Sequence, residues 1–207
     1  VGNYWLPAAL KLFRDSHPSI DVLCGLGNAE QVLEGTIRGE HDLGFISGSA
    51  ADPLPEHLAC EAVGHESLQV VVAAGHPWFG LSHLEPEQLT QSSWVMREKG
   101  SGARQMFADG LSKLAINIDS LPVALVLNSS EMVKSLVLQG GGAAALPESM
   151  IRQETSLGKL WSLEVDGLTM RQSILMIRHA QREYSSLIGA FEREVHAANQ
   201  PIDSVSP

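Results

Sequence analysis

The first fifty residues switch between the hydrophobic spacing of helices and that of strands. Apolar residues at i, i+3, i+4 and i+7 predict a helix over about residues 4–16, and a second such face follows Asn28 and ends at Gly39. Residues 20–24 alternate apolar with polar or small side chains as a strand does, and residues 42–47 form a short apolar run. The order helix, strand, helix, strand favours a parallel α/β sheet.

The middle of the chain begins a second α/β series. Residues 58–63 and 68–74 are two apolar stretches, too close together for a helix between them. The later segments alternate between the hydrophobic spacing of strands and that of helices. They are a strand over residues 93–96, a helix with Ala103, Met106, Phe107, Leu111 and Leu114 inward, a strand over 123–127, a helix over 149–155, strands over 160–163 and 172–177, and a last helix over 183–198 with Leu187, Ile188, Phe191 and Val195 buried.

One stretch, from Ser129 to Pro147, combines a polar helix start with two flanking apolar runs. Ser129 or Ser130 can cap the helix, Glu131 lies near its positive end, and the glycines at 140–142 stop it. The backbone N–H groups at such a helix start can bind a small ligand. An ordinary capped helix in a core fits the same spacing equally well.

Similar polar residues begin three other helices. The pairs Gly27-Asn28 and Ser101-Gly102 and the segment 2–4 each combine a small residue with a hydroxyl or amide group. If two sheets face each other, these junctions converge on one cleft, and Arg97 and Arg104 add counter-charges for an anionic ligand. Each junction alone is more often only a capped helix, but the recurrence in both halves favours a shared cleft.

Composition narrows the class of protein. With 207 residues, 44% hydrophobic and 18% charged, the chain is long enough for one large domain or two small lobes. The formal charge of −10 argues against a broad basic surface for nucleic acid, and no apolar run approaches the ~20 residues of a membrane span. Cys24 and Cys60 can form a disulfide, but buried free thiols in a reducing cytosol are favoured.

No pattern of catalytic or metal-binding residues stands out. The chain has no GxxxxGK[ST] loop, no GxGxxG opening a helix after the first strand, no G-x-S-x-G elbow and no H-E-x-x-H. His76 lies in a Gly-His-Pro turn with no second ligand at a workable spacing, so a turn histidine is favoured over a metal ligand. The sequence therefore predicts no enzyme, no resident cofactor and no metal.

Five segments, in this order and spacing, resemble the effector-binding domain of LysR-type transcriptional regulators. They cover nearly the whole chain and read GNYWLPAALKLFRDSHPSIDV, GNAEQVLEGTIRGEHDLGFI, SLQVVVAAGHPW, WVMREKGSGARQMF and NSSEMVKSLVLQGGGAAALPESM. The segment WVMREKGSG is most similar to relatives linked with sulfur oxyanions or carbon fixation. Ala103 stands where many relatives have threonine, which removes a hydroxyl group from that loop.

The resemblance implies an α/β fold of two Rossmann-like lobes joined by two crossover strands, as in type 2 periplasmic binding proteins. Lobe I would comprise residues 1–69 plus 175–207 and lobe II residues 70–174, with the crossovers at 68–74 and 172–177. The family's DNA-binding helix-turn-helix and its first strand would precede Val1. The ligand contacts that the resemblance carries over are Gly2, Asn3, Tyr4, Asn28, Arg97, Ser101, Gly102, Ser129 and Ser130.

The function implied is that of a sensor domain in a cytoplasmic DNA-binding regulator. It would bind a small-molecule effector, with an anion favoured, between its lobes, form a homodimer and, in the full-length protein, a tetramer. The faces expected to pair are those of Trp5, Leu6 and Leu12 and of the helix over 133–138. DNA would be contacted only through the absent N-terminal domain, and no membrane would be involved. The alternatives are a solute-binding protein of a transport system and, with small weight, a transferase or deaminase on a two-lobe scaffold.

Overall fold

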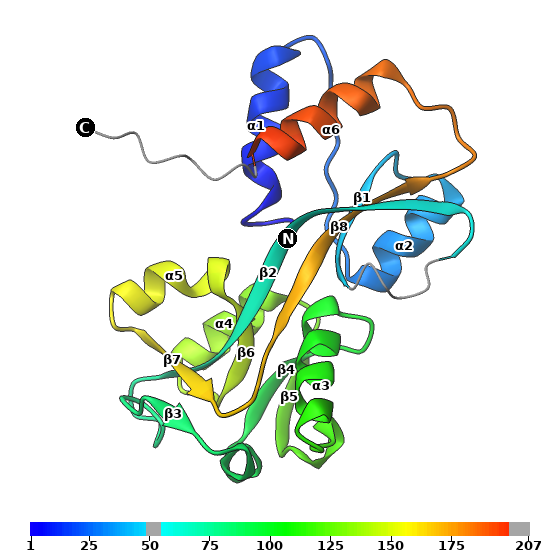
Figure 1. Ribbon diagram of the computed structural model, residues 1–207. Helices are drawn as coiled ribbons and strands as arrows, with labels where there is room; N and C mark the ends of the chain where they lie inside the picture. Colours follow the sequence, from blue (N-terminus) through cyan, green and yellow to red (C-terminus); the bar gives the residue numbers. More distant parts are fainter. Residues whose placement is uncertain (49–54, 199–207) are drawn as a thin grey trace. The chain divides into compact units, whose positions relative to one another are not determined.

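The computed structural model describes residues 1–48 and 55–198 and divides the chain into two units joined by two strands (Figure 1). Unit 1 comprises Val1–His65 with Ser173–Pro207, and unit 2 comprises Glu66–Gln172. The two connecting strands are β2, Leu58–Ala73, and β8, Arg171–His179. The sequence placed the boundaries a few residues later, at 69/70 and 174/175.

Unit 1 consists of helices packed on the two faces of a short pair of antiparallel strands. Its remaining elements are α1 Leu6–Ser16, α2 Ala29–Arg38, β1 Gly44–Gly48 and α6 Ser186–Ala198. Helix α1 has Pro7 in its first turn, where the missing N–H costs nothing. Helix α2 begins at the cap residue Asn28, whose side chain forms a capping box with Gln31, and ends at a left-handed Gly39.

The core of unit 1 lies on both faces of β1 and β8. Helices α1 and α6 pack together on one face, where the Phe13 and Phe191 rings meet edge to face at 5.2 Å. Helix α2 packs on the other face, against Ile46 and Ile177. Strand β1 pairs with β8 in the antiparallel sense. The parallel sheet expected here is therefore wrong, because β8 enters unit 1 from the distant second crossover and runs against β1.

The predicted strand over residues 20–24 is also wrong. These residues belong to no strand, and Val22, Leu23 and Leu26 are exposed. An extended segment forms a strand only where a neighbour satisfies its backbone groups, and none of the strand pairings found in residues 1–48 and 55–198 includes it. Cys24 and Cys60 are free but exposed, so their expected burial is wrong as well.

Helix α6 also buries less than its spacing predicted. Leu187 is exposed, whereas Gly189, Ala190 and Val195 of the same helix are buried. Leu6, expected on a pairing surface, is instead buried in the core of unit 1.

Unit 2 has a mixed sheet and a separate parallel pair. Its elements are β3 His83–Leu84, the 3₁₀ helix η1 Pro86–Gln91, β4 Trp94–Arg97, α3 Gly102–Lys113, the 3₁₀ helix η2 Ile118–Ser120, β5 Val123–Leu127, α4 Ser130–Leu138, β6 Ala144–Pro147, α5 Glu148–Ser156 and β7 Leu160–Val165. Strands β6 and β7 pair with β2 in the antiparallel sense, and β3 pairs with β7 in parallel. The two apolar stretches 58–63 and 68–74 are one continuous strand, β2, rather than separate segments.

Strand β4 connects the two sheets of unit 2. It pairs in parallel with β5, and its Trp94 forms a bridge to Ala143, just before β6. The Trp94 indole N–H donates to the Leu89 carbonyl at 2.8 Å, so this fully buried side chain has its polar atom satisfied. The start of β4 is thereby fixed in the core.

The histidine in the turn after β2 has a structural role, as the sequence predicted. The Nδ1 atom of His76 accepts the Trp78 backbone N–H at 3.1 Å, and Nε2 lies 2.8 Å from the Ser92 hydroxyl. Partial burial lowers the pKa of His76, which favours the neutral ring that this geometry requires. Within residues 1–48 and 55–198 no three His, Cys, Asp or Glu side chains group as metal ligands, and none of the helices there could cross a membrane.

Candidate ligand-binding site

The parallel pair β4–β5 brings two helix starts to one edge of unit 2. Arg97, at the end of β4, is in register with Leu127, at the end of β5, and the Glu98 backbone N–H donates to the Leu127 carbonyl at 3.1 Å. Each strand leads into a helix, β4 into α3 and β5 into α4. The carboxyl ends of adjacent parallel strands are where α/β sheets bind ligands.

Helix α4 starts as its sequence predicts. Ser129 is the cap residue and its hydroxyl accepts the Met132 backbone N–H at 3.4 Å. The helix ends at Leu138, before the glycines, and Val133 and Val137 are fully buried in the core. These two valines therefore fix the helix, which leaves Ser130 at the polar edge and rules out their expected role in pairing with another copy.

Helix α3 starts differently. Its cap residue, Ser101, has extended backbone angles but makes no capping side-chain hydrogen bond, and no acidic residue lies in the first turn. Ser101 is almost completely buried, with 3% of the residue's surface exposed. Gly102 is the first helical residue. The N-terminus of a helix favours an anion over a cation.

Arg97 contacts both helices, α4 through its guanidinium group and α3 through its main-chain carbonyl. Its Nη1 donates to the Ser130 hydroxyl at the start of α4. Its Nε donates to Glu98 Oε2 at 2.8 Å and its Nη2 to Glu98 Oε1 at 3.0 Å. From α3, Arg104 donates through Nη1 to the Arg97 carbonyl at 2.9 Å. Arg97 and Glu98 are both mostly shielded, with 15% and 22% of their side chains exposed.

A small pocket opens next to this cluster. It lies between β4, the first turns of α3 and Ala145 of β6, and its lining combines apolar side chains with two arginines. Its lining residues are Val95, Met96, Arg97, Ala103, Arg104, Phe107 and Ala145. Ala103 contributes a methyl group to this lining.

Four of the nine predicted ligand residues lie in unit 1. Asn3 and Tyr4 are exposed in the turn before α1, and a Cβ at Gly2 would approach Leu26 Cδ2 to 2.5 Å. Asn28 uses its side-chain oxygen to cap α2, accepting the Gln31 N–H at 2.9 Å. The other five belong to unit 2, which brings Arg97 into contact with Ser130 and places Ser129 and the start of α3 at the same strand ends.

The ion pair between Arg97 and Glu98 was not predicted from the sequence. The sequence pattern gives no sign of a contact between Arg97 and Glu98, because side chains adjacent in an extended segment normally point to opposite faces. In the structure the Glu98 carboxylate nevertheless lies on the Arg97 guanidinium, with Oε2 2.8 Å from Nε. Arg104 was expected to be a counter-charge, and its contact with the Arg97 carbonyl is an additional positioning role.

The chain is similar to known regulators over nearly its whole length. The family model described as LysR substrate binding domain matches residues 1–200. A probable RuBisCO transcriptional regulator of Emiliania huxleyi is 25% identical over 195 residues, covering 94% of this chain and 62% of that protein. The HTH-type transcriptional regulator CbbR of Rhizobium meliloti (strain 1021) is 27% identical over 198 residues, covering 96% of this chain and 62% of that protein.

A solved structure with a bound small molecule has the same fold. The regulatory domain of Synechocystis PCC6803 CcmR, in complex with 2-PG, matches with a TM-score of 0.84 and 24% identity, covering 97% of this chain and 94% of that chain. The present chain spans less than two thirds of the length of the two curated relatives.

Proposed function

The chain belongs to the family of LysR substrate binding domains, and from this premise we propose that it senses a small-molecule effector for a cytoplasmic DNA-binding transcription regulator. Family membership confirms the resemblance read from the sequence and the two-lobe α/β fold that it implied. DNA would be contacted by a part of the regulator outside this chain. The domain would act by binding and by shifting a conformational equilibrium, without catalysis.

The effector we propose is a small anion held at the carboxyl ends of β4 and β5. The observation that carries this proposal is the shielded guanidinium group of Arg97, in contact with Ser130 at the start of α4. A guanidinium presents a fork of N–H donors that matches carboxylate, sulfate and phosphate groups. The backbone at Ser101-Gly102 and at Ser129-Ser130 would add donors. The contacts that the sequence predicts from Gly2, Asn3, Tyr4 and Asn28 of unit 1 stay a prediction. The CcmR regulatory domain, which has the same fold, is found in complex with the small molecule 2-PG, and this supports a small-molecule effector here.

The experiment is a binding screen of the purified domain against sulfate, phosphate, small carboxylates and phosphorylated sugars. A ligand at a hundredfold excess over Kd stabilises the folded state by about 2.7 kcal/mol, which thermal unfolding detects. We expect one chemical class of anion to raise the midpoint, and we expect Arg97→Ala and Ser130→Ala each to weaken the affinity for that anion by about tenfold or more.

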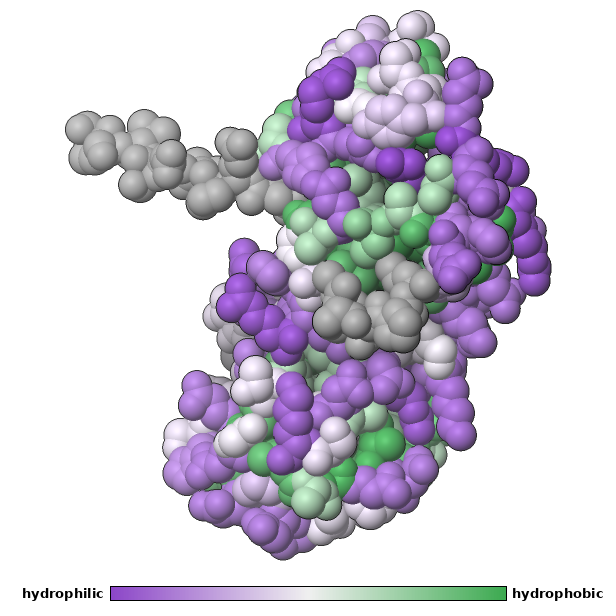
Figure 2. Space-filling view, turned by 45° about the vertical axis from the view of Figure 1, so that its right-hand side comes forward, coloured by the Kyte–Doolittle hydropathy of each residue, from purple (hydrophilic) through white to green (hydrophobic). Residues whose placement is uncertain are grey.

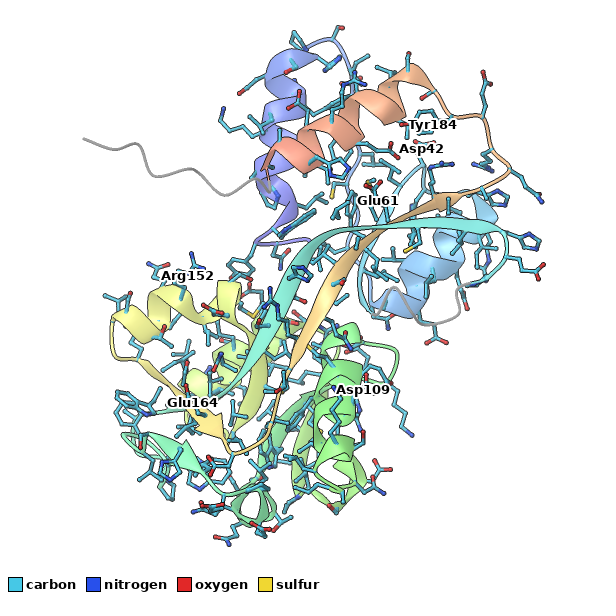
Figure 3. All side chains as sticks on the ribbon, in the orientation of Figure 1. Asp42, Glu61, Asp109, Arg152, Glu164 and Tyr184 are labelled. Carbon is cyan, nitrogen blue, oxygen red and sulfur yellow. The ribbon has the colours of Figure 1, made fainter. Side chains whose placement is uncertain are left out.

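Arg152→Ala is the matched control. Arg152 lies exposed on α5, within the same unit (Figure 3). Its removal subtracts the same charge from unit 2 and should leave binding unchanged. Equal affinities in Arg97→Ala and wild type would remove Arg97 from the site, and binding only of uncharged compounds would contradict the anionic effector.

A second copy of the chain is the partner we propose for the exposed apolar strand of unit 2. Val123, Leu125 and Val126 of β5 and Met132 of α4 are exposed. In the residues that the structure describes, β5 pairs only with β4, so its other edge is unpaired. Hydrophobic edge strands are normally covered, and oligomers cover them by symmetric pairing. Tetramers of the full-length regulator would require contacts beyond this domain.

The alternative of a solute-binding protein for transport is less well supported. The relatives matched over nearly the whole chain are transcription regulators. The exposed Cys24 and Cys60 are unpaired thiols, which are typical of a reducing compartment rather than a secreted carrier.

A further inference from the structure

The strongest charge contact at the proposed site is internal to the chain. Two donors of Arg97, Nε and Nη2, point to the two oxygens of Glu98 at 2.8 and 3.0 Å. This parallel, two-point geometry is the one by which arginine binds carboxylate or phosphate ligands. Glu98 therefore occupies one edge of the guanidinium in the same way that an anionic effector would.

The surrounding charges make this contact unusual. The segment from Arg97 to Arg104 has three basic residues, Arg97, Lys99 and Arg104, and a single acidic one, Glu98. The first turn of α3 contains no acidic residue. The acidic side chain of an otherwise basic segment is thus placed on the guanidinium that faces Ser130.

The backbone holds Glu98 in place independently of its side chain. Its N–H donates to Leu127 at 3.1 Å and its carbonyl accepts the Ser101 N–H at 3.3 Å. Loss of the carboxylate would therefore leave this loop anchored. Both charged side chains are mostly shielded from water, so their attraction is screened less than that of a surface pair.

We propose that Glu98 is an internal competitor for the effector: its carboxylate occupies Arg97 and must move away before the anion binds. This inference rests on the proposed anion site and specifies its regulation. Displacement costs the Arg97–Glu98 contact, which lowers the affinity for every anion. It thereby selects ligands with enough additional contacts to offset that loss.

The test compares Glu98→Gln with wild type, using inorganic phosphate as the probe in isothermal titration. The amide has the same shape but no charge, so it competes less strongly for the guanidinium and no longer repels the anion. We expect the phosphate Kd to fall by about tenfold, the effect of removing a charged hydrogen bond. Glu98→Asp, which retains the charge, should remain close to wild type.

Two controls separate the inference from general effects. Glu164→Gln removes one negative charge from an exposed position on β7 (Figure 3) and should leave phosphate affinity unchanged. The double variant Glu98→Gln with Arg97→Ala should lose the gained affinity, since the gain acts through the guanidinium.

The results also separate this inference from the proposed function. If Arg97→Ala weakens phosphate binding while Glu98→Gln binds no more tightly than wild type, the site stands and the competitor role is overturned. Weaker binding in Glu98→Gln would overturn it too, because it would make Glu98 a residue that positions Arg97. If neither wild type nor Glu98→Gln binds phosphate, the competitor role is overturned, and the wider anion screen then decides the proposed function.

Discussion

Gly142 lies where the chain leaves α4 and enters β6, at a position that only glycine suits. Its φ is +123°, and a Cβ there would lie 2.4 Å from the Ser93 carbonyl oxygen. That carbonyl accepts the Ala143 N–H at 2.9 Å, so it cannot move away without loss of the link between β4 and the start of β6.

We therefore expect Gly142→Ala to lower the free energy of unfolding by about 2 kcal/mol or more. Gly140→Ala is the control, because Gly140 has φ +83° but no atom within 4 Å of its Cβ position. That variant carries only the left-handed strain of about 1 kcal/mol. Urea unfolding of both variants measures the difference, and equal losses would mean that the carbonyl contact does not matter.

At the scale of single residues, the sequence predicted roles that depend on local spacing. Ser129 as a cap and His76 as a turn residue follow from their immediate neighbours, and the structure confirms both. The contact of Arg97 with Ser130 joins residues 33 positions apart and depends on the pairing of β4 with β5. The fold of Glu98 back onto Arg97 depends on the conformation of one loop, which no spacing rule specifies.

At the scale of elements, the residues at the start of α4 both stabilise the helix and belong to the proposed binding site. Ser129 accepts the Met132 N–H at 3.4 Å, a rather long capping bond. We expect Ser129→Ala to lower the free energy of unfolding by about 0.5–1 kcal/mol, the lower part of the range for lost caps. Ser129→Asp, which keeps a capping oxygen, should restore most of it.

Asn128→Ala provides the comparison for this prediction. Asn128 precedes the cap and is exposed, so its loss should change stability by less than about 0.5 kcal/mol. Chemical unfolding without ligand distinguishes these cases. If Ser129→Ala were as stable as wild type, the hydroxyl would be available for ligand binding rather than for capping.

The sequence predicted helices well, because their formation depends on residues within the helix. It predicted strands less well, because a strand forms only where another strand pairs with it. Helices α1 to α6 follow from apolar spacing and from caps such as Asn28 and Gly39. Residues 20–24 have a strand pattern but no pairing partner in the described chain. The two apolar stretches around residue 65 are one 16-residue strand because both ends of β2 have partners.

At the scale of the whole molecule, the distribution of exposed apolar residues bears on assembly. Hydrophilic residues cover much of the visible face, and hydrophobic ones appear among them on both units (Figure 2). Each of the first four β5 side chains is exposed, although a strand in a folded core normally buries one face. The sequence pattern assigned the pairing surfaces to the first helix and to Val133–Leu138 instead, because helical spacing alone does not reveal which face meets the domain's own core.

The dimer proposed for β5 can be tested with two exposed hydrophobic residues of unit 2. Val126 on β5 is 53% exposed, and Leu157, after α5, is 60% exposed. Replacement of either by lysine places a charge in water and should leave the fold intact. A lysine at 126 would be buried without a partner if β5 pairs with a second copy, and burial of an unpaired charge is costly.

In sedimentation velocity at micromolar concentration, we expect wild type and Leu157→Lys to be dimers and Val126→Lys to be mainly monomeric. A monomeric wild type would contradict the dimer, whereas dissociation by Leu157→Lys alone would move the interface to the end of α5.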